Sequence, residues 1–256
     1  MSEVRRLETS EELAEAARHH PVVGLDIGPG FEPPAFAVAT AAGWAVVFSR
    51  RSDHAVPGAA TLGDAVGLDT LFADPVVQRW FRESGARHLS APRQHQHVLA
   101  RHLDLGERGG DWDWMWTRTP PPRVPGEDRV VDLSPADRDA AVDLLTRHSP
   151  RTHGQPFARP GQEWVGVRDA GGALVALGGS EPSQAGTPTL VGVAVDRSRR
   201  GGGLGSAVSA VLTRRAVETS GACALGMFAD NDAARRVYRR LGYVTAVEWR
   251  SRWLDR

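Results

Sequence analysis

The sequence VAVDRSRRGGGLG, residues Val193–Gly205, decides the fold of the second half of this chain. It reads as the end of a strand, a glycine turn and the start of a helix. The apolar positions that repeat at helical spacing are Leu204, Ala207, Val208, Val211, Leu212 and Val217. Glycine lets the main chain approach phosphate oxygens, and the amides and dipole of a helix N-terminus attract anions. The stretch predicts a phosphate-binding turn, with a tight structural connection as the alternative.

Strands and helices are predicted on both sides of this turn. The predicted strands are 129–133, 163–168, 173–179, 189–195, 222–228 and a final strand after residue 241. The predicted helices run from Ser134 to about Arg147, from 204 onward, and over 232–241, and Ser134 is expected to be the first N-cap. Residues 148–161 have no periodicity, which predicts a loop over the sheet. This order predicts an α+β fold with a mixed α/β sheet.

A second segment, NDAARRVYRRLGY at residues Asn231–Tyr243, lies downstream of the turn. It holds the only asparagine of the chain and both of its tyrosines, Tyr238 and Tyr243. Asn231 suits the N-cap of a helix, and Gly242 suits the left-handed position that ends one. We expect Tyr243 and the single cysteine, Cys223, to pack in the core.

Together the two segments resemble the signatures of the GNAT acetyltransferase superfamily. Arg200-x-x-Gly203-x-Gly205 is similar to its Gln/Arg-x-x-Gly-x-Gly/Ala loop. The second segment is similar to its Asn-x-x-Ala-x-x-x-Tyr-x-x-x-Gly-Phe/Tyr pattern. The resemblance covers roughly the last half of the chain and implies the GNAT acyl-CoA N-acyltransferase fold there. A dinucleotide-binding fold would need a carboxylate about 20 residues beyond the glycines, but Gly221 and Ala222 stand there.

The resemblance also implies the residues of a site. Main-chain groups of the glycine loop would bind the pyrophosphate of the co-substrate acetyl-CoA, and those of Val193 and Val195 would hold its pantetheine arm. Tyr238 would be the catalytic residue, a general acid toward the departing thiolate; a core tyrosine is the alternative. The implied coenzyme-binding set is Val193, Ala194, Val195, Arg200, Gly201, Gly202, Gly203, Leu204, Gly205, Asn231, Ala234 and Tyr238.

The sequence does not identify a general base. Many GNAT enzymes carry a glutamate on the strand before the glycine loop, but residues 189–193 have no carboxylate. Glu163 and Glu181, at neighbouring strand ends, are candidates, and so is a water chain to solvent. The loop expected to cover the acceptor carries or adjoins side chains that could face it or be simply solvated: His148, His153, Arg147, Arg151 and Arg159.

Composition excludes several classes of function. The 31 basic and 31 acidic residues give a net charge of zero, so we expect no nucleic acid and no membrane as partner. A single cysteine excludes an intramolecular disulfide and a cysteine-rich zinc site, and no metal is expected. The absence of lysine excludes Schiff-base chemistry and phosphate-loop nucleotide hydrolases. We expect a cytoplasmic protein, and the Ala, Arg, Gly and Pro excess indicates a bacterial gene.

A proline-rich linker at 119–128 is predicted to join domains 1–118 and 129–256. In the first half, the predicted elements are helices 9–18, 75–84 and 94–103, a hairpin of strands 35–40 and 44–50, and a strand near 87–91. A further strand would carry Trp112, Trp114 and Trp116 on one face, as an acceptor wall or as core. Matching element order predicts an internal duplication, so 1–118 is interpreted as a degenerate GNAT-like domain, as in tandem members of the superfamily.

Three functions remain open at this point. The first is transfer of the acetyl group of acetyl-CoA to a primary amine of a small molecule, by direct attack in a ternary complex. The second is acetylation of a protein N-terminus or lysine, which requires an open groove. The third is acyl-CoA sensing without turnover, suggested by the missing strand carboxylate. We expect a monomer or a homodimer.

Overall fold

The computed structural model describes residues 4–50 and 56–254 and divides the chain into two compact units. Unit 1 consists of Met1–Trp114, Phe228–Asp230 and Ala246–Arg256, and unit 2 consists of Met115–Met227 and Asn231–Thr245. The outermost residues of the predicted domain ranges, 1–3 and 255–256, lie outside the described residues.

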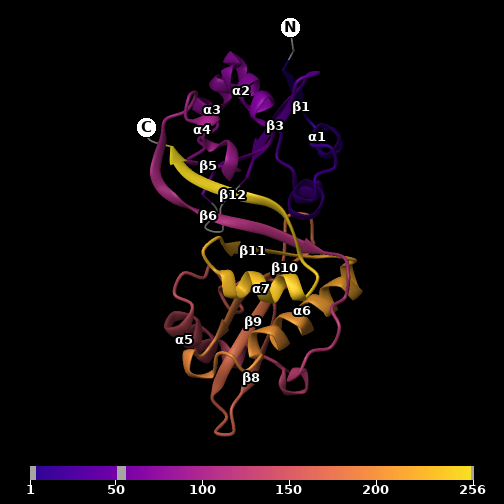
Figure 1. Cartoon of the computed structure of the whole chain (residues 1–256), viewed down its shortest axis with the longest axis vertical. Coiled ribbons are helices and arrows are strands. Elements are labelled where there is room, and N and C mark those ends of the chain that lie inside the picture. The colour runs from indigo at the N-terminus through magenta and orange to yellow at the C-terminus, as the bar shows by residue number, and fades with distance from the viewer. Residues whose placement is uncertain (1–3, 51–55, 255–256) are drawn as a thin grey trace. The chain divides into compact units, whose positions relative to one another are not determined.

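Unit 1 is a mixed sheet with helices packed against it (Figure 1). Its elements are β1 (Arg5–Leu7), α1 (Ser10–Ala16), β2 (Ala35–Ala39), β3 (Trp44–Ser49), β4 (Ala59–Gly63), α2 (Ala65–Ala73), α3 (Pro75–Glu83), β5 (His88–Pro92), α4 (Gln96–Leu99) and β6 (Leu105–Thr117). Strands β1 to β4 pair antiparallel in sequence order, and β4 pairs parallel with β5. One apolar cluster joins the sheet to α2, α3 and α4, while α1 packs against β2 and β3.

Unit 2 has the same kind of layered structure. Its elements are β7 (Val131–Asp132), α5 (Arg138–His148), β8 (Glu163–Arg168), β9 (Leu174–Pro182), β10 (Pro188–Val195), α6 (Leu204–Ser220), β11 (Cys223–Phe228), α7 (Asp232–Arg240) and the first two residues of β12 (Val244–Leu254). Trp164 packs with α5 in one apolar cluster, and Val165 packs with α6 in another. Because neighbouring residues of a strand point to opposite faces, α5 and α6 cover opposite faces of the sheet.

The two units repeat one topology, as expected for the predicted internal duplication. In unit 2, β7 to β10 pair antiparallel in sequence order and β10 pairs parallel with β11, as β1 to β5 do in unit 1. In each series, helices also follow the first, the fourth and the fifth strand. An α/β domain of the same design therefore precedes the one that carries the glycine loop.

The last strand of the chain corrects the predicted domain range 129–256. Strand β12 pairs antiparallel with β5, from Trp249 opposite Pro92 to Trp253 opposite His88. Strand β6 lies on the other side of β12 in the same sheet. Most of β12, the final strand of the second repeat, therefore belongs to unit 1. No local pattern in the sequence predicts this pairing.

The prediction that residues 119–128 form a linker is also corrected. These residues belong to unit 2, and side-chain contacts fix the end of the segment there. From α6, the guanidinium of Arg214 donates to both carboxylate oxygens of Glu127, at 2.9 Å each. The same side chain donates to the carbonyl oxygens of Pro121 and Pro122, at 3.3 Å each. The contacts of Arg214 hold this segment against α6.

Buried side chains of β6 and β12 hold unit 1 together. Trp114 is 2% exposed, and Trp112 stacks on Trp249 with ring centroids 5.8 Å apart. These contacts favour packing over an acceptor wall for these two indoles. Between them, the carboxylate of Asp113 is almost fully buried and receives a hydrogen bond of 2.8 Å from Arg93.

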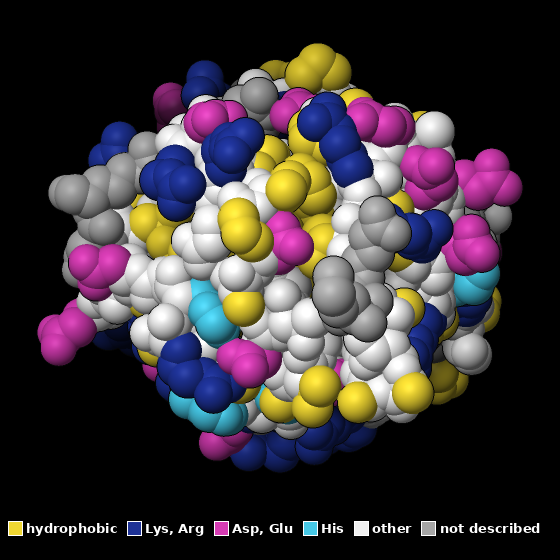
Figure 2. Space-filling model, turned by 90° about the horizontal axis from the view of Figure 1, so that it is seen from above, with side chains coloured by type: hydrophobic (Ala, Val, Ile, Leu, Met, Phe, Trp, Pro, Cys, Tyr) yellow, Lys and Arg dark blue, Asp and Glu magenta, His cyan; other side chains and the backbone are white. Residues whose placement is uncertain are grey.

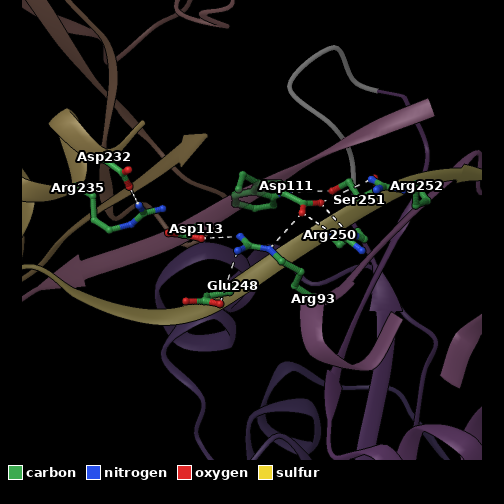
Figure 3. Close-up of polar contacts among 10 residues, drawn as sticks. Arg93, Asp111, Asp113, Asp232, Arg235, Glu248, Arg250, Ser251 and Arg252 are labelled. Carbon is green, nitrogen blue, oxygen red and sulfur yellow. Dashed lines mark hydrogen bonds and ion pairs between the residues drawn. The ribbon is translucent and has the colours of Figure 1, made fainter. Parts of the chain in front are cut away.

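Arg93 is also part of a wider ion network in unit 1 (Figure 3). Its Nε atom lies 3.4 Å from Asp111, whose carboxylate also receives two hydrogen bonds from Arg250, at 2.8 and 2.6 Å. Glu248, on the exposed side, lies 3.7 Å from Arg93. The network joins β12 and β6 to the turn after β5.

Charges of both signs are mixed on the face drawn in Figure 2, with apolar side chains between them. This agrees with the net charge of zero. No helix in the described residues is both long enough and apolar enough to cross a membrane.

Candidate functional site

The end of β10 separates from its parallel neighbour. The register of β10 with β11 covers Thr189 and Leu190. On its other side, β10 stays paired with β9 as far as Val195, with an irregularity between Val191 and Ala194. The main chain after Leu190 therefore has one paired edge, and the edge toward β11 is left open to a ligand that extends the sheet.

The glycine loop follows and leads into α6. Gly201 and Gly203 have φ of +84° and +79°, in the left-handed region, and a Cβ atom built on either would meet nothing within 4 Å. Gly203 is the N-cap of α6 and supplies no side chain to its first amides. Leu204 is buried and fixes the helix start on the core. An N-terminus of this kind, with its space kept clear, suits a phosphate group.

Arg200 contributes to this loop in an unexpected way. Its Nε donates to the carbonyl of Val195 at 3.2 Å, and its Nη2 donates to the carbonyl of His148 at 2.8 Å. His148 in turn accepts the amide of Arg197 at 3.1 Å and lies 3.6 Å from Asp196. The guanidinium thus binds carbonyl groups of the protein and stabilises the loop. A bound anion would contact the main chain of Arg200, and the positive charge of the side chain would attract it.

Helix α7 presents the second predicted segment. The side chain of Asn231 accepts the amide of Ala234 at 3.1 Å, which confirms its N-cap prediction. Gly242 has φ of +89°, which confirms the left-handed position after the helix. Tyr238 is 8% exposed and packs edge-on against Tyr243, with ring centroids 5.7 Å apart. The roles of Asn231, Ala234 and Tyr238 toward a coenzyme remain predictions.

A chain of buried polar groups lies beside Tyr238. The hydroxyl of Tyr243 donates to Sγ of Cys223 at 3.1 Å and lies 2.8 Å from Oγ1 of Thr213. Burial raises the pKa of Cys223 to about 11, so the thiol is inert at neutral pH. Burial also raises the pKa of Tyr238 to about 12; the nearby Cys223 thiol adds to this, and the hydroxyl of Ser209 opposes it. Tyr243 and Cys223 are core residues, as predicted.

The side chains considered as bases are engaged in ion pairs or hydrogen bonds. Glu163 pairs with Arg215 on α6. Glu181 accepts from Gln162 at 2.7 Å and pairs with Arg159 at 3.2 Å. Both candidate carboxylates therefore already have cationic partners within unit 2.

The histidines and arginines in and next to residues 148–161 were the other side chains considered for the acceptor site. Arg147 pairs with Asp143, and Arg159 pairs with Glu181, so neither is a dedicated anion receptor. His148 is held by the loop contacts described above, while His153 is exposed. The described residues contain no group of three His, Cys, Asp or Glu side chains that could hold a metal ion. The sequence analysis considered His148 only as a side chain that could face the acceptor, and it missed the contacts of this residue with the glycine loop. It also missed Ser209, because this residue belongs to no recognisable motif.

Comparisons with known proteins identify the domain that contains this site. Residues 129–243 match the model of the acetyltransferase (GNAT) family. A GCN5-related N-acetyltransferase from Sphaerobacter thermophilus is similar in structure, with 18% identity, a TM-score of 0.56 and coverage of 98% of this chain and 95% of that one. A GCN5-related N-acetyltransferase from Kribbella flavida has 18% identity, a TM-score of 0.54 and 96% coverage of both chains.

A tandem GNAT protein from the clavulanic acid biosynthesis pathway is similar as well. It has 15% identity and a TM-score of 0.51, with 100% of this chain and 98% of that one covered. At such identities these likenesses show the fold alone. No curated protein has a matching sequence.

Proposed function

Residues 129–243 form a domain of the GNAT acetyltransferase family, and from this premise we propose that the chain transfers the acetyl group of acetyl-CoA to a primary amine of a small molecule. The observation that carries the proposal is the uncapped N-terminus of α6, which follows two left-handed glycines and the open edge of β10. A diphosphate suits the helix start, and an extended amide-containing arm suits the strand edge.

The reaction requires one bond to form and one to break at the acetyl carbon. In a ternary complex the amine nitrogen bonds to the thioester carbon, and the carbon–sulfur bond breaks. Sulfur takes the proton of the Tyr238 hydroxyl, and the proton of the nitrogen leaves to solvent. Since the pKa of Tyr238 is raised to about 12, its hydroxyl keeps its proton at physiological pH. A protonated phenol beside the sulfur can serve as the acid.

A sensor of acyl-CoA that does not turn over is the second candidate, and one observation favours it. The strand before the glycine loop has no carboxylate at residues 189–193, and both neighbouring glutamates have partners. An acceptor that reaches the site as an ammonium ion would then lose its proton only through water. Slow chemistry on a tightly bound coenzyme is the expected behaviour of such a site.

An acceptor screen separates these functions. Acetyl-CoA is offered with amino sugars, polyamines, amino acids and lysine-containing peptides, and free thiol is measured. Release with a small amine supports the proposal, and release with peptides only indicates a protein acetyltransferase. Tight binding of acetyl-CoA by calorimetry with no thiol release indicates a sensor. If acetyl-CoA neither binds nor reacts, the proposal is wrong.

A further inference from the structure

Ser209 is a buried hydroxyl on the apolar face of α6. The residue is fully buried, and in the part of the chain that the structure describes its Oγ atom forms no hydrogen bond. An unsatisfied buried hydroxyl destabilises the folded state, whereas alanine would fit the same helix without that cost. Its presence therefore suggests a use that the free protein does not show.

Thr213, one turn further along α6, gives the contrast. Its Oγ1 donates to the carbonyl of Ser209 at 2.7 Å and lies 2.8 Å from the hydroxyl of Tyr243. Both hydroxyls lie on the same helix face, because residues four apart are neighbours there. The Thr213 hydroxyl has a hydrogen-bond acceptor in the carbonyl of Ser209, whereas the Ser209 hydroxyl has no partner among the described residues.

Tyr238 is the tyrosine next to Ser209. Its ring lies edge-on against that of Tyr243, 5.7 Å away, so it faces the same side of α6. Tyr238 belongs to the same buried cluster as Val208 and Ala210, the two neighbours of Ser209 on α6. The Ser209 hydroxyl lowers the pKa of the Tyr238 phenol, but the two form no hydrogen bond in the free protein.

We propose that Ser209 is a positioning residue for the acid step, whose hydroxyl donates to the Tyr238 oxygen as that oxygen gives up its proton. The proposal rests on the proposed function. In the step, the O–H bond of Tyr238 breaks and an S–H bond forms on coenzyme A, which leaves a negative charge on the phenolate oxygen. The free hydrogen of Ser209 then points at that charge, and the phenolate regains a proton from solvent in the next stage of the cycle.

The other groups around Tyr238 make this assignment specific. The titratable groups that face it are the thiol of Cys223 and the phenol of Tyr243. Burial raises the pKa of Cys223 to about 11 and the pKa of Tyr243 well above its ordinary value, so both stay neutral. The hydrogen of Tyr243 is already directed to Cys223. Ser209 is thus the hydroxyl left to stabilise a phenolate at position 238.

The two tyrosines of the chain allow a test that needs no acceptor. The full chain is labelled with 3-fluorotyrosine, which lowers the pKa of both phenols, and fluorine NMR follows their titration. Tyr243→Phe assigns the two signals. A hydrogen bond to a charged oxygen is worth enough to shift a pKa by about one unit. We therefore expect Ser209→Ala to raise the midpoint of Tyr238 by about one unit, while Thr213→Val moves Tyr243 and leaves Tyr238 in place.

An unmoved Tyr238 midpoint in Ser209→Ala overturns the proposal. Should the alanine variant fail to fold, Ser209→Cys replaces the hydroxyl by a weaker donor of similar shape, and the same upward shift is expected. Removal of an unsatisfied hydroxyl should leave the melting temperature unchanged or higher. A large loss of stability would indicate a purely structural hydroxyl and would also overturn it.

Turnover distinguishes failure of this inference from failure of the proposed function. With any acceptor from the screen, Ser209→Ala should lower kcat about tenfold in the wild-type background and have no effect in Tyr238→Phe. Equal kcat in wild type and Tyr238→Phe would reject the acid role itself. A lowered kcat in Tyr238→Phe with an unchanged kcat in Ser209→Ala would reject only the role of Ser209.

Discussion

The turn between β4 and α2 and the turn between β10 and α6 occupy the same place in two copies of one fold, but their helix starts differ. In unit 1 the N-cap is Asp64, whose carboxylate accepts the amides of Gly67 and Trp44 at 2.9 Å each. In unit 2 the N-cap is Gly203, which supplies no side chain. The N-terminus of α2 therefore has a carboxylate as its cap, whereas the N-terminus of α6 has no side-chain cap.

The surroundings of the two turns differ in the same sense. A Cβ atom on Gly67 would meet the carbonyl oxygen of Trp44 at 2.1 Å, so β3 closes the space in front of α2. A Cβ atom on Gly203 would meet nothing within 4 Å. Both tyrosines of the chain also belong to unit 2. The comparison teaches that topology alone does not make the proposed site, so one coenzyme per chain is the expected result of a binding experiment.

The largest effect is expected from Gly203→Val. A β-branched residue resists φ of +79°, and its side chain fills the space for phosphate. Loss of two charge-assisted hydrogen bonds should weaken acetyl-CoA binding roughly 100-fold or more by calorimetry. Gly186→Val is the matched control, because Gly186 has the same φ of +79° and open space around it. Equal affinities of the two variants would contradict the assignment of the loop.

Tyr238→Phe tests the acid, which unit 1 lacks. A general acid contributes at least about 100-fold, so kcat should fall by roughly that factor while the Kd of acetyl-CoA stays unchanged. Tyr243→Phe removes the other phenol, which contacts Thr213 and Cys223. It should keep kcat and lose about 1 kcal/mol of stability. A fall in kcat for both variants alike would point to packing.

Asp113→Ala tests whether the ion network around Arg93, in the turn after β5 of unit 1, serves structure and not coenzyme binding. The variant leaves Arg93 without its buried partner (Figure 3). Because Arg93 is itself 26% exposed, we expect a loss of about 2 kcal/mol in urea unfolding, with unchanged acetyl-CoA affinity. Glu248→Ala, which removes an exposed partner at 3.7 Å, should cost under about 0.5 kcal/mol. A lost affinity in Asp113→Ala would assign this network to the site.

Asp64→Ala should have the smallest effect. Partial burial raises the pKa of Asp64, but the amides of Gly67 and Trp44 outweigh it and leave the pKa below its usual value. The cap therefore stabilises the folded state at pH values above the pKa that Asp64 has in the unfolded chain. This contribution is lost as the pH falls through the pKa that Asp64 has in the folded state. We expect a loss of about 1 kcal/mol at pH 7, shrinking below about pH 4.

Asp74→Ala is the control for this variant, since Asp74 caps α3 through the amide of Val76 at 2.8 Å. Both variants should lose similar stability and keep one coenzyme per chain. A second bound coenzyme in Asp64→Ala would show that the carboxylate alone had closed an otherwise complete site.

Local signals predicted most of unit 2. The predicted strand 163–168 coincides with β8, and the predicted helix 232–241 ends one residue beyond α7. Caps, glycine turns and alternation act within a few residues, so they can be read directly from the sequence. The glycine loop and the left-handed position of Gly242 were predicted for the same reason.

Other elements depend on distant partners and were missed. Strand β4, with the sequence AATLG, has small residues and no alternation, because it is buried on both sides. The predicted helix 94–103 is reduced to α4, Gln96–Leu99. The transfer of β12 to unit 1 and the position of Ser209 beside Tyr238 exist only in the folded chain.

Amide NMR of the full chain tests the central claim most directly, because one titration with acetyl-CoA reads both helix starts at once. We expect large shifts at Gly203, Leu204 and Gly205, whose amides would meet the diphosphate, and none at Gly67, whose amide is held by Asp64. Shifts at Gly67, or an unperturbed loop at residues 203–205 with coenzyme bound, would contradict the account.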